Sequence, residues 1–152
     1  MLAPMTIETE LVAVRDAGLD VRHFTLAAIA GTLPPFSAGA HVDVHLPGGL
    51  VRQYSLCGDP DAGGAYEIAV LREPASRGGS VAMHGLEAGA RLTISPPRNL
   101  FALDETASKT LLFAGGIGIT PLLAMARRLH RLGADFELHY CARTQALSLI
   151  HI

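Results

Sequence analysis

Arg52-Gln53-Tyr54-Ser55-Leu56 closes the second of two alternating runs, which a hairpin signal, Pro47-Gly48-Gly49, separates. The runs cover His41 to Leu46 and Leu50 to Leu56, and their period of two predicts a pair of antiparallel strands. An arginine, an aromatic ring and a hydroxyl on one extended segment are suited to a planar, anionic ligand. The same residues also fit an ordinary strand with an exposed arginine and a half-buried tyrosine, so the rest of the chain has to distinguish the two.

The composition is that of a globular protein, with 49% hydrophobic and 17% charged residues in a chain of 152. A net charge of -2 shows no basic stripe, which argues against a nucleic-acid partner. Apolar runs fall short of the ~18 residues that a membrane span requires, and no secretory signal is visible. We therefore expect a cytoplasmic monomer without a membrane anchor. Cys57 and Cys141 fit no metal spacing and are expected to be two buried thiols; the histidines show no ligand pattern either, so we expect them at the surface and predict no metal site.

Short strands joined by glycine- and proline-rich turns occupy about the first hundred residues. Besides the hairpin, we expect strands at Thr6–Asp16, Val21–Ala28, Ala65–Arg72 and Arg91–Ser95, with a turn at Ala17–Gly18. This spacing predicts a small antiparallel β-barrel.

A glycine pair then interrupts the strand pattern. Ser76-Arg77-Gly78-Gly79-Ser80 precedes a short apolar helix, Val81 to His84. Successive backbone N–H groups of such a pair can form an anion-binding nest, to which Arg77 adds charge and Ser80 a hydroxyl. A flexible turn with a capping serine is the alternative interpretation.

The last third of the chain reads as a strand, a glycine-rich turn, a helix and a second strand. Thr110 to Ala114 is a continuous apolar run, which predicts a strand buried on both faces. Gly115-Gly116-Ile117-Gly118-Ile119 follows, and Thr120-Pro121 provides an N-cap and a first helical residue. The helix is expected to end near Gly133, before a strand at Phe136–Cys141. This pattern is typical of the start of an α/β doubly wound, nucleotide-binding domain, although its glycine spacing differs from Gly-x-Gly-x-x-Gly.

We therefore divide the chain into a barrel domain (1–105), a first β-α-β part of an α/β domain (106–146) and a tail (147–152). Two strands with one helix cannot bury both faces of a sheet, so we expect the chain to be a fragment of a longer protein. The tail matches the translation of a transposon end used in preparing sequencing libraries, and we expect it to be foreign to the natural sequence. A natural apolar C-terminal strand is the alternative.

The three motifs occur in one order: Arg-x-Tyr-Ser-Leu, Arg-Gly-Gly-Ser and Gly-Gly-Ile-Gly-Ile-Thr-Pro. This order resembles the ferredoxin reductase-like superfamily, and within it the phthalate dioxygenase reductase and vanillate O-demethylase reductase family. The likeness extends to about Thr144. It implies a flavin-binding barrel, a nicotinamide-binding domain and a [2Fe-2S] domain, of which the third and most of the second are missing here. Ser76 departs from the family, where glycine is frequent.

The resemblance also implies the roles of individual residues. Tyr54 would lie against the isoalloxazine and Ser55 near its N5 edge, and these two are the candidate catalytic residues. Gly78, Gly79 and Ser80 would receive the phosphate. The implied flavin contacts are Arg52, Tyr54, Ser55, Val70, Leu71, Arg72, Arg77, Gly78, Gly79, Ser80 and Val81. Gly115, Gly116 and Gly118 would let the nicotinamide nucleotide approach the backbone. Thr120 would lie where the second domain meets the flavin, and Pro121 is a further cofactor-binding candidate.

The implied activity is that of an NAD(P)H-dependent flavin oxidoreductase, the reductase of an aromatic-ring oxygenase or O-demethylase. Electrons would pass from NADH through FMN to a [2Fe-2S] centre, and then to an oxygenase component or a ferredoxin. An FAD-containing ferredoxin–NADP reductase, a non-catalytic flavin-binding subunit and an inert fragment are the alternatives. The sequence does not decide whether NADH or NADPH is the electron donor, because Arg143 could face a 2′-phosphate, a pyrophosphate or solvent.

Overall fold

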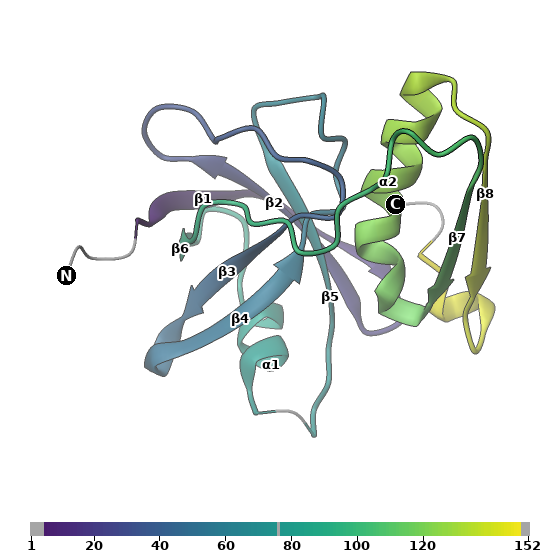
Figure 1. Ribbon diagram of the computed structural model, residues 1–152. Helices are drawn as coiled ribbons and strands as arrows, with labels where there is room; N and C mark the ends of the chain where they lie inside the picture. The colour runs from purple at the N-terminus through teal and green to yellow at the C-terminus, as the bar shows by residue number, and fades with distance from the viewer. Residues whose placement is uncertain (1–4, 76, 150–152) are drawn as a thin grey trace.

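The structure is a computed structural model that describes residues 5–75 and 77–149. In this part of the chain six antiparallel strands form one sheet in the order β4-β3-β6-β1-β2-β5 (Figure 1). The predicted barrel architecture is confirmed. Its strands are β1 (Ile7–Gly18), β2 (Val21–Ala28), β3 (His41–Leu46), β4 (Leu50–Ser55), β5 (Tyr66–Leu71) and β6 (Arg91–Ile94).

The sheet curls so that its two edge strands, β4 and β5, come together. The backbone N–H of Cys57, just after β4, donates to the carbonyl oxygen of Glu67 in β5 at 2.8 Å. The hairpin between β3 and β4 is the predicted one, since a short η1 (Pro47–Gly49) links the strands. Gly48 has φ +77 and Gly49 φ +73, in the left-handed region that favours glycine.

The barrel core is made by one face of each strand. Phe24 and Leu26 of β2 are fully buried in it, together with Val42 and Val44 of β3. Burial of each such side chain contributes ~1.5–3 kcal/mol relative to an exposed position. Val21, on the opposite face of β2, instead joins a second core formed with the C-terminal unit, so β2 contributes to both cores.

The short helix α1 (Gly79–His84) lies between β5 and β6 in the chain. Its N-cap residue, Gly78, has φ +85, so the first glycine of the pair adopts a conformation that most side chains disfavour. Ser76, which the motif also includes, lies outside the described residues.

The C-terminal unit consists of β7 (Thr110–Gly115), η2 (Gly116–Gly118), α2 (Ile119–Leu132), β8 (Phe136–Cys141) and η3 (Gln145–Leu147). β7 and β8 pair in parallel, as predicted for the start of a doubly wound sheet. Figure 1 shows α2 between this small sheet and the barrel. α2 therefore packs against the small sheet on one side and against the barrel on the other.

Three local predictions were wrong. β1 continues to Gly18, and the turn comes at Leu19 and Asp20, where Asp20 adopts φ +57. Thr120 is not the N-cap of α2, because the helix begins one residue earlier and the Thr120 hydroxyl donates to the carbonyl oxygen of Ile117 at 3.1 Å. The predicted C-terminal end at Gly133 is confirmed by its left-handed φ of +66.

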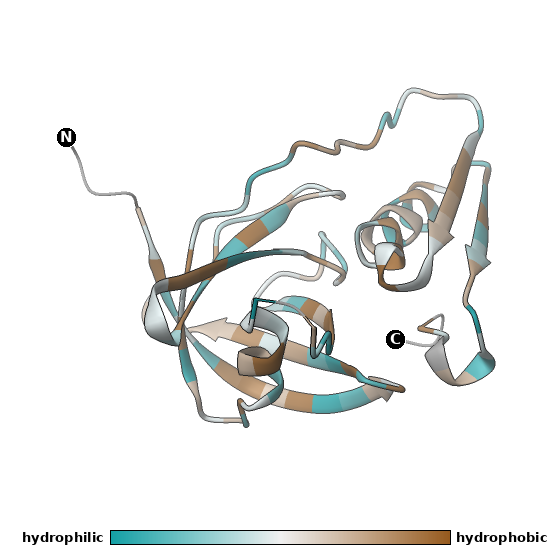
Figure 2. Cartoon of the chain, turned by 90° about the horizontal axis from the view of Figure 1, so that it is seen from below, coloured by the Kyte–Doolittle hydropathy of each residue, from teal (hydrophilic) through white to brown (hydrophobic). Residues whose placement is uncertain are grey.

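The third error concerns β7, which is not buried on both faces in this chain. Leu112 and Ala114 face α2 and are buried, whereas Leu111 and Phe113 are exposed. Figure 2 shows β7 as an almost wholly hydrophobic strand beside the mixed β8. Nothing in the described residues covers the outer face of β7, although the Phe113 ring stacks on that of His139.

Candidate functional site

A cavity of about 440 Å³ lies between the ends of β4 and β5 and the start of α2. We call it the barrel cavity. Eight of the predicted site residues line it, which brings the Arg-x-Tyr-Ser motif and the Gly-Ile-Thr-Pro motif to one place. The eight are Tyr54, Ser55, Val70, Leu71, Ser80, Gly118, Thr120 and Pro121; Gln53, Ala69, Glu73 and Ile117 complete the lining.

Tyr54 and Ser55 hold neighbouring positions at the end of β4. Tyr54 is half-buried, and this burial raises the pKa of its hydroxyl while the nearby Arg52 guanidinium opposes the shift. The phenol therefore stays neutral at physiological pH. Backbone pairing with His41 fixes Ser55 in the sheet, so this part of the cavity wall is a rigid strand.

Arg52 folds over the glycine pair. A Cβ built on Gly79 would lie 2.6 Å from Cγ and 2.7 Å from Nε of Arg52, so no side chain fits there without moving the arginine. Arg52 Nη2 also donates to the carbonyl oxygen of Arg77 at 3.2 Å, and Nη1 to that of Val51 at 2.8 Å. The predicted combination of guanidinium and glycine loop is thus present as one cradle, formed by Arg52, Gly78 and Gly79.

Ser80 links this cradle to the segment after β5. Its hydroxyl accepts a hydrogen bond from the Glu73 backbone N–H at 3.0 Å. The other predicted contacts lie elsewhere: the Arg77 side chain is exposed, and Val81 and Arg72 line a separate cavity of about 570 Å³ beside the β1–β2 turn. Val81 therefore does not reach the barrel cavity.

A second cavity, of about 700 Å³, lies where the barrel meets the carboxyl ends of β7 and β8. We call it the junction cavity. Gly115 and Gly116 line it as predicted, and Arg72 and Arg143 add two positive charges. The other lining residues are Val21, Leu71, Glu73, Ile117, Cys141, Ala142 and Leu149. An anionic ligand suits this lining, because glycine backbone and arginine side chains are common partners of phosphate.

The two cavities have a common wall. Leu71, Glu73 and Ile117 line both of them. The two cavities therefore adjoin along these three residues.

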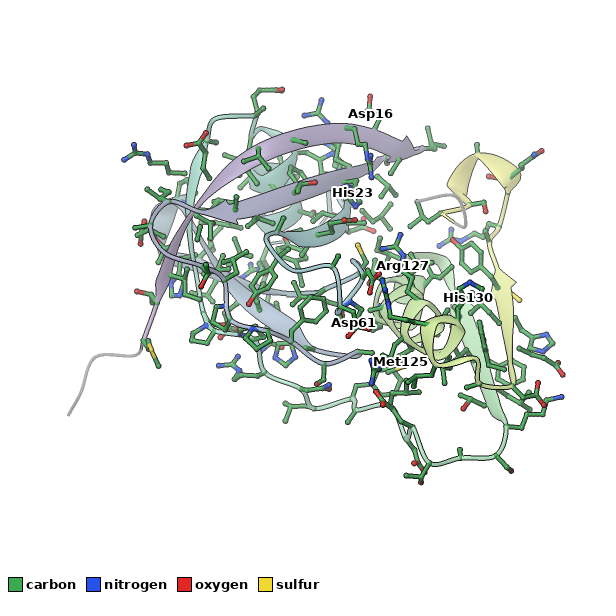
Figure 3. The ribbon with its side chains drawn as sticks, turned by 90° about the horizontal axis from the view of Figure 1, so that it is seen from above. Asp16, His23, Asp61, Met125, Arg127 and His130 are labelled. Atoms are coloured by element: carbon green, nitrogen blue, oxygen red, sulfur yellow. The ribbon has the colours of Figure 1, made fainter. Side chains whose placement is uncertain are left out.

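Arginines of α2 hold the C-terminal unit against the barrel. Arg127 Nη1 donates to the carbonyl oxygen of Cys57 at 2.8 Å, two residues beyond the end of β4. Arg128 Nη1 and Arg131 Nε lie 3.1 Å and 3.4 Å from Oδ2 of Asp61. Figure 3 shows Arg127 and Asp61 between α2 and the barrel. These contacts fix the position of α2 relative to the strand that carries the motif.

Beneath Arg127 the structure brings together three potential metal ligands that sequence spacing did not suggest. Single ligand atoms of His23, Cys57 and Glu67 lie within 4.8 Å of one another. His23 Nε2 lies 3.0 Å from Glu67 Oε2, and this hydrogen bond is the main reason for the lowered pKa of Glu67. The Arg127 guanidinium lies 3.9 Å from the same carboxylate, so a positive charge already stands beside the group. The group is thus a hydrogen-bonded network between barrel and helix.

The expectations for histidines and thiols need two corrections. His23 is buried rather than at the surface, because Glu67 supplies its polar partner. Cys57 is buried, and this burial raises the pKa of its thiol to about 12. Cys141 is exposed, because it lies on the uncovered face of β8.

Four lining residues of the barrel cavity were missed. Gln53 and Ile117 lie inside the quoted motifs, so their positions between predicted contacts could have identified them. Glu73 follows Arg72 by one residue in the same extended segment. The alanine side chain of Ala69 offers no functional group that could have identified it, and Ala69 lines the cavity only because of the way β5 packs.

Comparison with known proteins finds relatives of this chain. A scan against models of protein families finds no match. The chain is 58% identical over 139 residues to the vanillate O-demethylase oxidoreductase of Pseudomonas putida, covering 91% of this chain and 44% of that protein. It is 49% identical to the heme-dependent oxidative N-demethylase beta subunit of Ectopseudomonas mendocina (strain ymp), covering 90% of this chain and 45% of the relative.

A solved structure agrees with these relatives. The structure described as phthalate dioxygenase reductase, a modular structure for electron transfer from pyridine nucleotides to [2Fe-2S], superposes with a TM-score of 0.91 at 38% identity. The match covers 94% of this chain and 46% of that one. Over more than 90% of its length the chain is similar to the vanillate O-demethylase oxidoreductase and to the phthalate dioxygenase reductase. It spans less than half the length of the proteins just named.

One further property concerns membranes. Among the described residues, no helix combines the length and the apolar character needed to cross a bilayer.

Proposed function

We propose that this chain provides the flavin-binding barrel and the first part of the nicotinamide-binding module of an NAD(P)H-dependent oxidoreductase. The whole protein would be the reductase component of an oxygenase or O-demethylase. The observation that carries the proposal is the common wall of Leu71, Glu73 and Ile117 between the barrel cavity and the junction cavity. A hydride can pass between two ligands only when their reacting atoms are held in contact, so the proposal requires the two ligands to meet along this shared edge of the adjoining cavities.

The barrel cavity suits a flavin in size and in chemistry. Its volume of about 440 Å³ and mainly apolar lining are ordinary for a cofactor site. The half-buried Tyr54 supplies an aromatic surface, and Ser55 supplies a hydroxyl. The cradle of Arg52, Gly78 and Gly79 suits a terminal phosphate, because Gly79 admits no side chain beneath the guanidinium.

Each of these groups then has a proposed task. When bound, a flavin supplies hydride acceptance at N5 and release of single electrons to an iron–sulfur centre. Ser55 would donate a hydrogen bond to the bound flavin, and Tyr54 would pack against it. Leu71 and Ile117 exclude water from the wall, while Gly118 and Thr120 bring the start of α2 to the flavin. The protein thus contributes position and electrostatics, and no general acid–base pair is needed.

FMN is the proposed flavin, because the cradle of Arg52, Gly78 and Gly79 suits a terminal phosphate. NADH is the proposed donor, with Gly115 and Gly116 against the nucleotide and Arg72 and Arg143 near its phosphates. The proposed acceptor is a [2Fe-2S] centre that serves an oxygenase. The relatives' names support a pyridine nucleotide as donor and a [2Fe-2S] centre as acceptor, since they include demethylase components and a reductase that transfers electrons from pyridine nucleotides to [2Fe-2S].

The test is the visible absorption spectrum of the purified chain, with its cofactor released and identified. We expect FMN, either bound on purification or taken up on addition. The matched variant Arg52→Ala should bind FMN at least tenfold more weakly, because it loses a charge-assisted phosphate contact. FAD would contradict the assignment of the cradle to a terminal phosphate. A colourless chain that takes up neither flavin would refute the proposal.

A further inference from the structure

His41, the first residue of β3, carries a buried nitrogen without a partner. Its Nε2 is shielded from solvent and forms no hydrogen bond with any residue in the described part of the chain. The residue as a whole is only half-buried, so other atoms of it reach the surface. Buried polar atoms without a partner are rare in native proteins, and a catalytic role is one of the physical reasons for keeping one.

The position of His41 is fixed from both sides. It pairs with Ser55 of β4 in the sheet, and it exchanges two backbone hydrogen bonds of 2.9 Å with Arg98 on its other side. Side chains of directly paired residues in antiparallel strands share a face, with Cβ atoms about 4.5–5.5 Å apart. A serine hydroxyl and an imidazole at that separation are within reach of one hydrogen bond. Rotation of the Ser55 hydroxyl about a single bond can therefore supply the partner that His41 Nε2 lacks.

Ser55 also connects His41 to the proposed flavin site. It lines the barrel cavity, and together with His41 it lines a shallow cavity of about 290 Å³. Leu100 and Phe101, which complete one side of the shallow cavity, are exposed, so this cavity lies at the molecular surface. Ser55 thus borders both the barrel cavity and a cavity that is open to solvent, and His41 stands beside it.

A carboxylate next to His41 can compensate the charge that an imidazole gains with a proton. Asp43 follows His41 by two residues, so both side chains project from the same face of β3. The two groups interact electrostatically. Asp43 Oδ2 pairs with Arg98 at 2.6 Å, while Asp43 Oδ1 is buried and has no hydrogen-bond partner among the described residues. One carboxylate oxygen is therefore left to face a positive imidazole.

The remaining neighbours of His41 add little charge. The same face of β3 continues with His45, which is exposed. From β4 this face presents Val51, Gln53 and Ser55, and none of these three side chains is charged. Arg98, from the segment after β6, is already paired with Asp43. The charge state of His41 therefore depends mainly on Asp43.

We propose that His41 exchanges protons between the bound flavin and solvent through the Ser55 hydroxyl; the inference rests on the function proposed above. A flavin that has accepted a hydride at N5 releases one proton as its two electrons pass to one-electron acceptors. The Ser55 oxygen takes up this proton while its own passes to His41 Nε2, so one O–H bond forms as another breaks. The imidazole, positive beside Asp43, then releases a proton from Nδ1 to water and is neutral again. Histidine is the side chain most often used for such transfers.

The other titratable residues at the barrel cavity are less suited to this task. Burial raises the pKa of the Tyr54 hydroxyl, which makes it a poor route for protons at neutral pH. Glu73 lies in the wall shared with the junction cavity, where a bound nucleotide would cover it. Among the described residues, the lining of the junction cavity includes neither His41 nor Ser55. A route through His41 therefore stays open while the nucleotide is bound.

The first test needs no flavin. ¹⁵N NMR of the flavin-free chain with labelled histidine follows the imidazole nitrogens, and His41→Gln assigns the signals of His41. Ser55→Ala should shift the Nε2 signal of His41, because it removes the hydroxyl opposite the ring. The signals of His45, which pairs with Val51 across the same two strands, should stay unchanged. An unshifted His41 signal overturns the inference.

The second test follows the proton step itself. The FMN-loaded chain is reduced with dithionite and reoxidised in a stopped-flow instrument by saturating ferricyanide, of which two ions accept one electron each. His41→Gln should bind FMN normally and reoxidise at least tenfold more slowly, because positioned acid–base groups accelerate proton transfer ~10²–10⁴-fold. Added imidazole should restore the rate. His45→Gln, on the same face of β3, is the matched control and should reoxidise at the normal rate.

Failure of the inference and failure of the proposed function give different results. A chain that takes up no flavin refutes the proposed function and the inference with it. Normal flavin uptake with equal reoxidation rates in the unaltered chain and His41→Gln overturns the inference alone. So does a slow His41→Gln that imidazole fails to restore, or one that binds FMN more weakly, because a purely structural role of His41 produces these results.

Discussion

A substitution in the cradle of Arg52, Gly78 and Gly79 should change the affinity for FMN much more than the stability of the fold. Gly79→Ala adds one methyl group at a position without a positive φ, so the backbone tolerates alanine. The new Cβ would lie 2.6 Å from Cγ and 2.7 Å from Nε of Arg52. Because these atoms belong to a flexible side chain, we expect the arginine to swing aside while the backbone stays in place.

The two effects of this substitution differ in size. Alanine gains ~0.5–1 kcal/mol over glycine within a helix. Displaced Arg52 loses exposed hydrogen bonds to Val51 and Arg77, worth about 0.5–1.5 kcal/mol each. The free energy of unfolding should therefore change by no more than about 2 kcal/mol. A lost charge-assisted contact to phosphate costs about 1.5–3 kcal/mol, which weakens FMN binding roughly 10- to 100-fold.

Quenching of flavin fluorescence measures the affinity, and urea unfolding measures stability. Riboflavin, which lacks the phosphate, is the matched ligand, and its affinity should not change. Gly85→Ala, at the opposite end of α1, is the matched variant, because its Cβ would meet only two carbonyl oxygens, at 3.4 Å and 3.8 Å. Equal weakening of FMN and riboflavin, or unchanged FMN affinity in Gly79→Ala, would show that the cradle does not hold a phosphate.

Four further predictions follow from particular contacts. Gly39→Ala should lower the free energy of unfolding by more than about 2 kcal/mol in urea, because its Cβ would lie 1.8 Å from a backbone carbonyl oxygen at φ +97; an equally stable variant contradicts this. At pH 8 Ellman's reagent should modify Cys141 alone, and Cys57 only after unfolding, because burial raises the Cys57 pKa to about 12. The hydrogen bond from His23 lowers the Glu67 pKa, so this carboxylate stabilises the fold above its unfolded pKa, near 4.5. The stabilisation is lost as pH falls through the folded pKa. Glu67→Gln should therefore flatten the dependence of the free energy of unfolding on pH in acid. Ser55→Ala should retain FMN and slow its reduction by NADH in stopped-flow experiments on a protein of the relatives' full length, and an unchanged rate excludes the proposed role.

Local sequence patterns predicted most elements of this fold because each depends on neighbouring residues. Alternation predicted β2 with both bounds correct, and Gly133 predicted the end of α2. The start of α2 was misplaced, because Gly118 and Ile119 take helical conformations that capping rules assign to later residues. Helix propensities alone do not show whether a Thr-Pro pair stands at the start of a helix or one residue inside it.

Contacts between distant segments could not be predicted from the residues alone. Arg52 and Gly79 meet only because β4 and α1 lie side by side at one end of the barrel. The partner of His23 depends on the register of β2 with β5, which no local pattern specifies. The family resemblance supplied the members of the candidate site, but the common wall at Glu73 required the structure.

The apolar run from Thr110 to Ala114 predicted more burial of β7 than this chain provides. A pattern that is hydrophobic on both faces reflects burial in the whole folded protein. In this chain β7 buries one face against α2 and leaves Phe113 69% exposed. The matched relatives are more than twice as long as the stretch they share with this chain. The outer face of β7 is therefore the face on which a doubly wound sheet takes a further layer.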